Sequence, residues 1–97
     1  MYARVIQVPV DIGKVDAGID AVDKAMQEVI KQLKGFAGSY LLVDRSEGKA
    51  IYIGLYDSQE DADAVMQSGV TQDVLSKLAE FMAGTPVIEG YEVALKP

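Results

Sequence analysis

Hydrophobic residues along the chain follow two different periods, and the changes between them predict its elements. Residues 2–10 are rich in β-branched types and form too short a run for a helix, so they predict a strand. From Asp16 to Lys34 hydrophobic residues recur at three- and four-residue steps, which places them on one face of a helix. We take Asp16 as the N-cap of this helix and Gly35 as the residue that ends it.

The second half of the chain predicts three more strands and one more helix. Residues 36–45 and 49–57 are two strand-like runs joined by a tight turn, which predicts a hairpin. Ser58 is placed to cap a second helix, which Gly69 interrupts before it resumes. Residues 87–95 predict the last strand.

This βαββαβ order predicts a ferredoxin-like α+β sandwich. Two right-handed crossovers place the strands of an antiparallel four-stranded sheet in the order 4-1-3-2, with both helices on one face. We expect residues 1–97 to form a single domain, because 97 residues cannot build two independent cores. The other face of the sheet is left without a cover.

The register of the hairpin decides which side chains lie on that uncovered face. We expect a type I turn with Gly48 in a left-handed conformation, which pairs Leu42 with Tyr52. The helix side then holds Leu41, Val43, Ile51, Ile53 and Leu55. The uncovered face then holds Phe36, Tyr40, Leu42, Tyr52 and Tyr56.

The facing of side chains in the first and last strands is predicted from the alternation of residue types along each strand. In the last strand, Val87 and Tyr91 suit the helix side, which leaves Glu92 on the uncovered face. The first strand is ambiguous, because its hydrophobic positions share their parity with Arg4.

An aromatic sheet face of this size indicates a binding surface. It fits a homodimer interface, a closed cavity between two subunits that holds a small apolar ligand, or a stacking platform for single-stranded RNA. Residues 49–56 match the RNA-recognition signature only loosely, and the net charge of −6 repels phosphate. The first two alternatives stay open, and we expect no nucleic acid as partner.

The composition excludes several kinds of chemistry. The chain has no His, Cys or Trp, and reading it through shows no Asn. Catalytic triads with a His base, His-ligated zinc or haem, and Cys nucleophiles are therefore excluded, and we expect no cofactor and no metal site. No apolar run approaches the roughly 18 residues of a membrane span, and no signal-peptide pattern precedes the first strand. With no disulfide framework, these features predict a cytoplasmic protein that does not enter the membrane.

Three short motifs resemble the antibiotic biosynthesis monooxygenase (ABM) family of the dimeric α/β-barrel superfamily. They are GFAG at 35–38, DR at 44–45 and YDS at 56–58. The resemblance implies a homodimer in which two sheets close into a barrel, with one cavity per subunit. It also implies cofactor-independent oxygenases that turn phenolic or quinol-like molecules into quinones with O₂. A related branch of the superfamily degrades haem.

The family's functional positions carry over only in part. Family oxygenases commonly place an Asn and a Trp four residues apart on the third strand, and these positions fall on Tyr52 and Tyr56. Haem-degrading relatives need a His on the second helix, which this chain lacks.

The expected ligand site is therefore built from tyrosines and one carboxylate. We expect Tyr40, Tyr52 and Tyr56 to pack against a small aromatic ligand and donate hydrogen bonds, and Glu92 to accept its proton. The sequence does not identify a catalytic residue. The alternative function is a non-catalytic small-molecule-binding or regulatory dimer.

Overall fold

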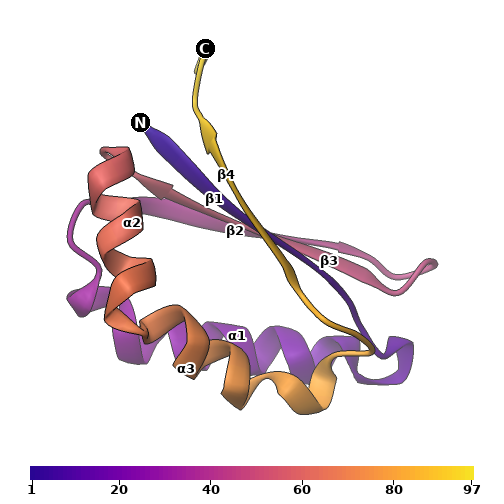
Figure 1. The fold of residues 1–97 in the computed structure, drawn as a ribbon. Coiled ribbons are helices and arrows are strands. Elements are labelled where there is room, and N and C mark those ends of the chain that lie inside the picture. The colour runs from indigo at the N-terminus through magenta and orange to yellow at the C-terminus, as the bar shows by residue number, and fades with distance from the viewer.

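Four strands form one antiparallel sheet, and every helix lies on the same side of it in the computed structural model, which describes all 97 residues (Figure 1). The strands are β1 (Tyr2–Pro9), β2 (Phe36–Asp44), β3 (Lys49–Tyr56) and β4 (Val87–Glu92). The helices are α1 (Val15–Val29), α2 (Gln59–Ser68) and α3 (Val70–Lys77). The sheet order β2-β3-β1-β4 is the predicted order read from the other edge, so the ferredoxin-like topology is confirmed.

The break between α2 and α3 follows from local signals in the sequence. The hydroxyl of Ser58 accepts a hydrogen bond from the backbone N–H of Asp61 at 3.1 Å, which caps α2 as predicted. Gly69 ends α2 with φ of 85°, a left-handed conformation that favours glycine. The predicted interruption at Gly69 is therefore confirmed.

The start of α1 differs from the prediction. A carboxylate oxygen of Asp11 accepts a hydrogen bond from Gly13 N at 3.0 Å and caps a short 3₁₀ turn, which runs directly into α1 at Val15. Asp16 lies inside the first helical turn, so its assignment as N-cap was wrong. Its carboxylate instead pairs with Arg45 at 2.9 Å.

The hairpin register also differs from the prediction, by one residue. Oδ1 of Asp44 accepts hydrogen bonds from the backbone N–H groups of Ser46 at 3.1 Å and Glu47 at 3.0 Å, and Gly48 N donates to the Asp44 carbonyl at 3.0 Å. These bonds hold a four-residue loop, so Asp44 pairs with Lys49 and not with Ala50. A shift of one residue turns a whole strand over relative to its neighbour.

The shift moves the aromatic residues of β3 to the other side of the sheet. Leu41, and not Leu42, lies opposite Tyr52, so Tyr52 and Tyr56 face the helices. A bulge between Phe36 and Gly38 brings Phe36 opposite Tyr56, where the two rings meet edge to face at 5.8 Å. The placement of Phe36, Tyr52 and Tyr56 on the uncovered face was therefore wrong.

Tyr40 and Leu42 do lie on the uncovered face, 63% and 48% exposed, as predicted. Ile51, Ile53 and Leu55 of β3 also lie on this face. Their predicted placement on the helix side was wrong because of the same register shift.

The register of β4 against β1 settles which way the side chains of these two strands face. Arg4 lies on the helix side and pairs with Gly90, and Tyr2 pairs with Glu92 on that same side. Val87 and Tyr91 therefore lie on the uncovered face, where they are 57% and 50% exposed. The predicted facing of Val87, Tyr91 and Glu92 was the reverse of what the structure shows.

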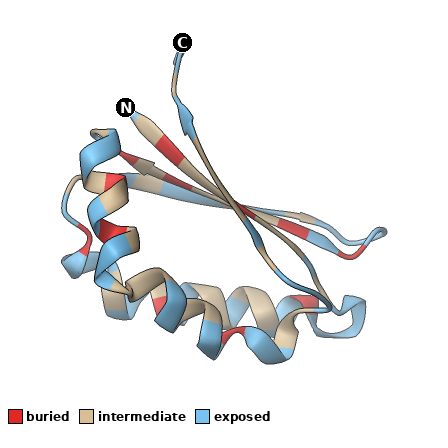
Figure 2. Ribbon diagram, in the orientation of Figure 1, coloured by how far each residue is buried: buried red, intermediate tan, exposed pale blue.

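The well-packed core lies at one end of the layer between sheet and helices. Leu33, Tyr56, Ala62 and Val65 form one buried cluster where α2 meets the sheet, and the other buried residues are spread along the strands and helices (Figure 2). No large side chain is fully buried. None of the helices combines the length and the apolar character that crossing a membrane needs.

Gly35→Ala should destabilise the fold by more than Gly69→Ala does. Both glycines have positive φ, 75° and 85°, but only at Gly35 would a Cβ overlap a neighbour, Asp61 Oδ2. The dihedral alone costs roughly 1–2 kcal/mol, and overlap with Asp61 adds to it. Urea denaturation midpoints of the two variants measure the difference, and equal losses would contradict a close approach at Gly35.

Candidate functional site

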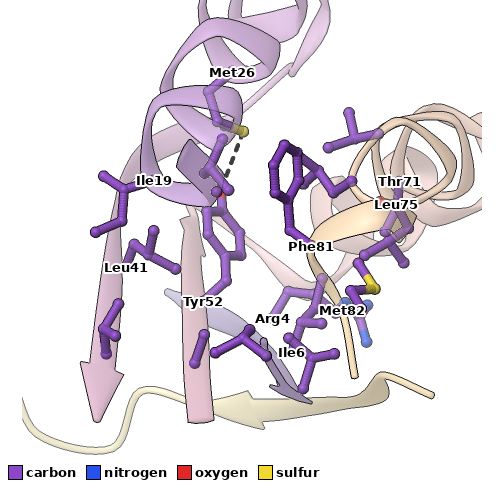
Figure 3. Close-up of a pocket in the computed structure, with 18 of the residues that line it drawn as sticks. Arg4, Ile6, Ile19, Met26, Leu41, Tyr52, Thr71, Leu75, Phe81 and Met82 are labelled. Carbon is purple, nitrogen blue, oxygen red and sulfur yellow. Dashed lines mark hydrogen bonds between the residues drawn. The ribbon is translucent and has the colours of Figure 1, made fainter. Parts of the chain in front are cut away.

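An apolar cavity of about 140 Å³ lies within one chain, between the helix side of the sheet and the helices (Figure 3). Of its 25 lining residues 21 are hydrophobic, so it favours an apolar ligand over water. The strands contribute Ile6, Val8, Val10, Leu41, Val43 and Ala50. The helical side contributes Ile19, Val22, Met26, Val74, Leu75 and Phe81.

The polar groups on the sheet side of this cavity come from Arg4, Tyr52 and Tyr56. Tyr52 projects from β3 towards α1, and its hydroxyl donates to the Met26 sulfur at 3.7 Å (Figure 3). Tyr56 is 5% exposed and joins the cavity to the buried cluster around Ala62. The sheet side of the cavity therefore combines an apolar surface with two tyrosine hydroxyls and one cation.

Glycines on both sides of Arg4 make room for these groups. Gly54 pairs with Arg4 across β3, and a Cβ there would come within 3.1 Å of the Tyr52 ring and 3.5 Å of the Tyr56 ring. Gly90 pairs with Arg4 across β4, and a Cβ there would lie 2.9 Å from Arg4 Nη1. Gly90, Arg4 and Gly54 become neighbours only through strand pairing, so the glycines could point to this site only once the strand register was known.

Arg4 is mostly buried and only partly satisfied. Its Nη2 donates to Asp63 Oδ1 at 3.0 Å, with the Arg4 side chain 15% and the Asp63 side chain 47% exposed. The guanidinium lies 5.6 Å from the centroid of the Tyr2 ring, within the range of a cation–π contact. Arg4 Nε is buried and has no hydrogen-bond partner. Sequence reasoning missed Arg4 as a site residue because its facing was ambiguous.

The surroundings of the tyrosines keep their hydroxyls protonated. Burial, together with repulsion from Tyr52, raises the pKa of Tyr56 from 10.0 to about 12, although the positive charge of Arg4 acts in the opposite direction. Burial also raises the pKa of Tyr52. Both side chains are therefore hydrogen-bond donors at neutral pH.

The structure brings together two of the four predicted ligand-binding residues. Tyr52 and Tyr56 line the cavity, whereas Tyr40 is exposed on the opposite sheet face and Glu92 is exposed at the end of β4. No Asp or Glu lines the cavity, so the predicted proton acceptor is not at this site. No group of three His, Cys, Asp or Glu side chains is placed to hold a metal ion.

The stability of the fold should fall between pH 10 and about 12, and Tyr56→Phe should remove part of that fall. The raised pKa of Tyr56 means that the unfolded chain loses this proton first, so the stabilisation is complete below pH 10.0 and is lost as pH rises towards about 12. The expected difference between the two proteins across this range is about 2 kcal/mol. Urea unfolding at a series of pH values measures it, and an identical fall in both proteins would contradict the assignment.

Comparison with known proteins gives relatives without an established function. No family model matches the chain. Two uncharacterized proteins of Mycobacterium tuberculosis, Rv2557 and MT2634, are each 28% identical to it over 94 residues, which is 97% of this chain. The chain spans 41% of the length of these relatives.

Solved structures resemble the chain along almost its whole length. A monooxygenase from the gene ActVA-Orf6 of Streptomyces coelicolor, in complex with the ligand nanaomycin D, has a TM-score of 0.79 at 15% identity and covers 99% of this chain and 91% of its own. A protein from Bordetella bronchiseptica assigned as an antibiotic biosynthesis monooxygenase has a TM-score of 0.79 at 14% identity and covers 97% of both chains. The chain thus has the fold of the antibiotic biosynthesis monooxygenase structures, as its motifs predicted.

Proposed function

We propose that this domain is a cofactor-independent monooxygenase that acts on small phenolic or quinol-type molecules held in the cavity between sheet and helices. The observation that carries the proposal is the cavity itself, about 140 Å³ in volume, apolar on most of its lining and furnished with the hydroxyls of Tyr52 and Tyr56. Such a site binds an aromatic ring by its faces and a ring oxygen by hydrogen bonds.

The reaction needs little chemistry from the protein. An ionised phenol is electron-rich enough to react with O₂ directly, so the site has only to bind it, favour its ionised form and exclude water. One oxygen atom of O₂ forms the new carbonyl at the ring carbon opposite the phenol oxygen, and the other leaves as water. The phenol itself supplies all the electrons as it becomes a quinone, so no external reductant enters the balance.

The comparisons support this proposal through shared shape. The Streptomyces coelicolor monooxygenase of the same fold is in complex with the ligand nanaomycin D. In this chain the two positions that correspond to the Asn and Trp of the family's oxygenases are Tyr52 and Tyr56, and both line the cavity. A ligand site at the same place, with different polar groups, is what this substitution favours.

The alternative function is a non-catalytic small-molecule-binding or regulatory protein. The chain lacks the family's Asn and Trp, and no carboxylate lines the cavity to accept a proton. These two observations favour binding without turnover. Oxygen consumption separates the two functions.

Wild-type protein should consume O₂ with hydroquinones or simple phenols, and Val22→Phe should abolish the uptake by filling the cavity that Val22 lines. Tyr52→Phe removes one hydroxyl from the cavity and should reduce uptake about tenfold, the effect of losing one hydrogen bond to a charged oxygen. An oxygen electrode measures the rates. Tyr40→Phe is the matched control, because Tyr40 lies on the opposite sheet face and should leave the rate unchanged.

Uptake by Val22→Phe equal to that of wild type would place the reaction outside the cavity. No uptake by wild type, together with thermal stabilisation by the same phenols, would favour the binding function.

We further propose that the uncovered sheet face is the interface of a homodimer. Its outward positions are mainly apolar: Val5, Tyr40, Leu42, Ile51, Ile53, Leu55, Val87 and Tyr91. A contiguous apolar face of this kind on a small protein indicates an association surface. β2 is an edge strand of the sheet, and pairing with a second chain would protect its free backbone groups.

The protein should have the mass of a dimer at micromolar concentration, and Ile53→Lys should convert it to a monomer. Ile53 pairs with Val5 on one side and Tyr40 on the other, so a charge there lies in the middle of the proposed interface. Size exclusion coupled to light scattering measures the mass. A monomeric wild type would contradict the interface, and Lys49→Glu at the exposed end of β3 is a control for a charge change outside its centre.

A further inference from the structure

We propose that Arg4 anchors an anionic oxygen on a single-ring aromatic ligand, so that the cavity selects ionised phenols or aromatic carboxylates over neutral rings. This inference rests on the proposed ligand-binding function of the cavity and narrows it to one chemical class.

The position of Arg4 supports this assignment. Its side chain is 15% exposed and lines the cavity (Figure 3), as the side chains of Tyr52 and Tyr56 do. The second cationic residue of the lining, Lys14, lies beyond the opposite end of β1, where its ammonium group meets the carbonyl of Glu80 at 3.4 Å. Arg4 is therefore the one positive charge at the tyrosines.

Arg4 also has a hydrogen-bond donor that no protein group accepts from. Asp63 accepts a hydrogen bond from Nη2, but the buried Nε has no acceptor. Buried donors in folded proteins nearly always find an acceptor, so an unmatched one beside a cavity indicates a missing partner. The flat guanidinium suits an oxyanion because its N–H groups lie in one plane with the acceptor oxygens.

The groups around Arg4 leave its charge only partly compensated. Tyr2 faces it from β1 itself, Tyr52 and Tyr56 from β3, and Asp63 from α2. β4 places Gly90, which carries no side chain, opposite Arg4, and the exposed Glu92 two residues further along on the same face. Asp63 is the carboxylate that pairs with Arg4, and its side chain is 47% exposed, so water weakens its hold on the cation. A ligand oxyanion inside the cavity would meet Arg4 with much less water between them.

An anion-binding Arg4 would allow the cavity to favour an ionised ligand without a carboxylate base. A neutral phenol in the cavity has no carboxylate to take its proton. A cation within about 4–6 Å lowers the pKa of an acid by 1–3 units. The ligand would leave its proton in the surrounding water, and contact of its oxygen with the guanidinium would favour the phenolate against the desolvation that raises the pKa of Tyr56. The phenolate is the form that reacts with O₂ in the proposed function.

The volume of the cavity limits the ligand to about one ring. An apolar cavity of about 150 Å³ in another protein accommodates benzene, and this cavity measures about 140 Å³. The ligand class is therefore a monocyclic arene with one anionic oxygen group and otherwise apolar substituents.

Binding of 4-nitrophenol tests the assignment, because its absorbance reports directly whether it is ionised. Bound to the wild-type protein, its pKa should fall by at least about one unit, equal to about a tenfold preference for phenolate over phenol. Arg4→Met should abolish this preference while the neutral ring still binds. Asp63→Asn should increase the preference, because it removes the carboxylate that competes for Arg4.

Two further variants serve as controls. Arg4→Lys keeps the charge and should retain part of the preference. Arg45→Met breaks the exposed ion pair with Asp16 at 2.9 Å, away from the cavity, and should behave as wild type. Circular dichroism checks that each variant is folded, and Asp63→Asn, at a half-exposed site, tests the proposal even if Arg4→Met does not fold.

Displacement of bound 4-nitrophenolate by benzoate and by phenol at high pH distinguishes carboxylates from phenolates as the natural class. Displacement by neutral toluene as effective as by either anion would overturn the proposal. An unchanged phenolate preference in Arg4→Met, or an unchanged one in Asp63→Asn, would overturn the role of Arg4 and leave the cavity as a neutral-ring site. No binding of any ring to wild type would overturn the proposed function as well.

Discussion

The hydrogen bonds that Asp44 makes within the hairpin turn determine the character of both faces of the sheet. Its carboxylate holds the backbone N–H groups of Ser46 and Glu47, and the loop between β2 and β3 therefore has four residues. Side chains alternate along a strand, so this choice decides that Tyr52 and Tyr56 face the helices. With a three-residue loop Tyr52 and Tyr56 would instead share a sheet face with Tyr40 and Leu42, opposite to Leu41 and Val43.

The layer between sheet and helices divides into a packed end and an open end. Around Ala62, which is 1% exposed, the side chains of Leu33, Tyr56 and Val65 close tightly and hold α2 against the sheet. Between α1, α3 and the middle of the sheet the side chains leave a cavity of about 140 Å³. Cavities cost stability, so a chain of 97 residues that keeps one loses part of the stability that close packing would give it.

Burial makes the polar groups of the cavity more effective. A medium of low dielectric disfavours ionisation of Tyr52 and Tyr56, whose pKa values are raised, and strengthens the attraction of Arg4 for an anion. The sheet accommodates this cluster because glycines occupy both positions that pair with Arg4, Gly54 and Gly90. A site that holds neutral donors and one cation in an apolar space is suited to an aromatic oxyanion.

The sequence by itself determined the order of the elements, the sheet topology, the cap at Ser58 and the break at Gly69, because each depends on hydrophobic period or on residues a few positions apart. It also indicated a fold shared with monooxygenases. Only the tertiary structure decided which face each strand shows to the helices. That outcome depends on a register shift of one residue in the hairpin turn, and on the pairing of β4 with β1 between residues 80 to 90 positions apart in the chain. Arg4 became a candidate site residue for the same reason, since its glycine neighbours are adjacent only in the folded sheet.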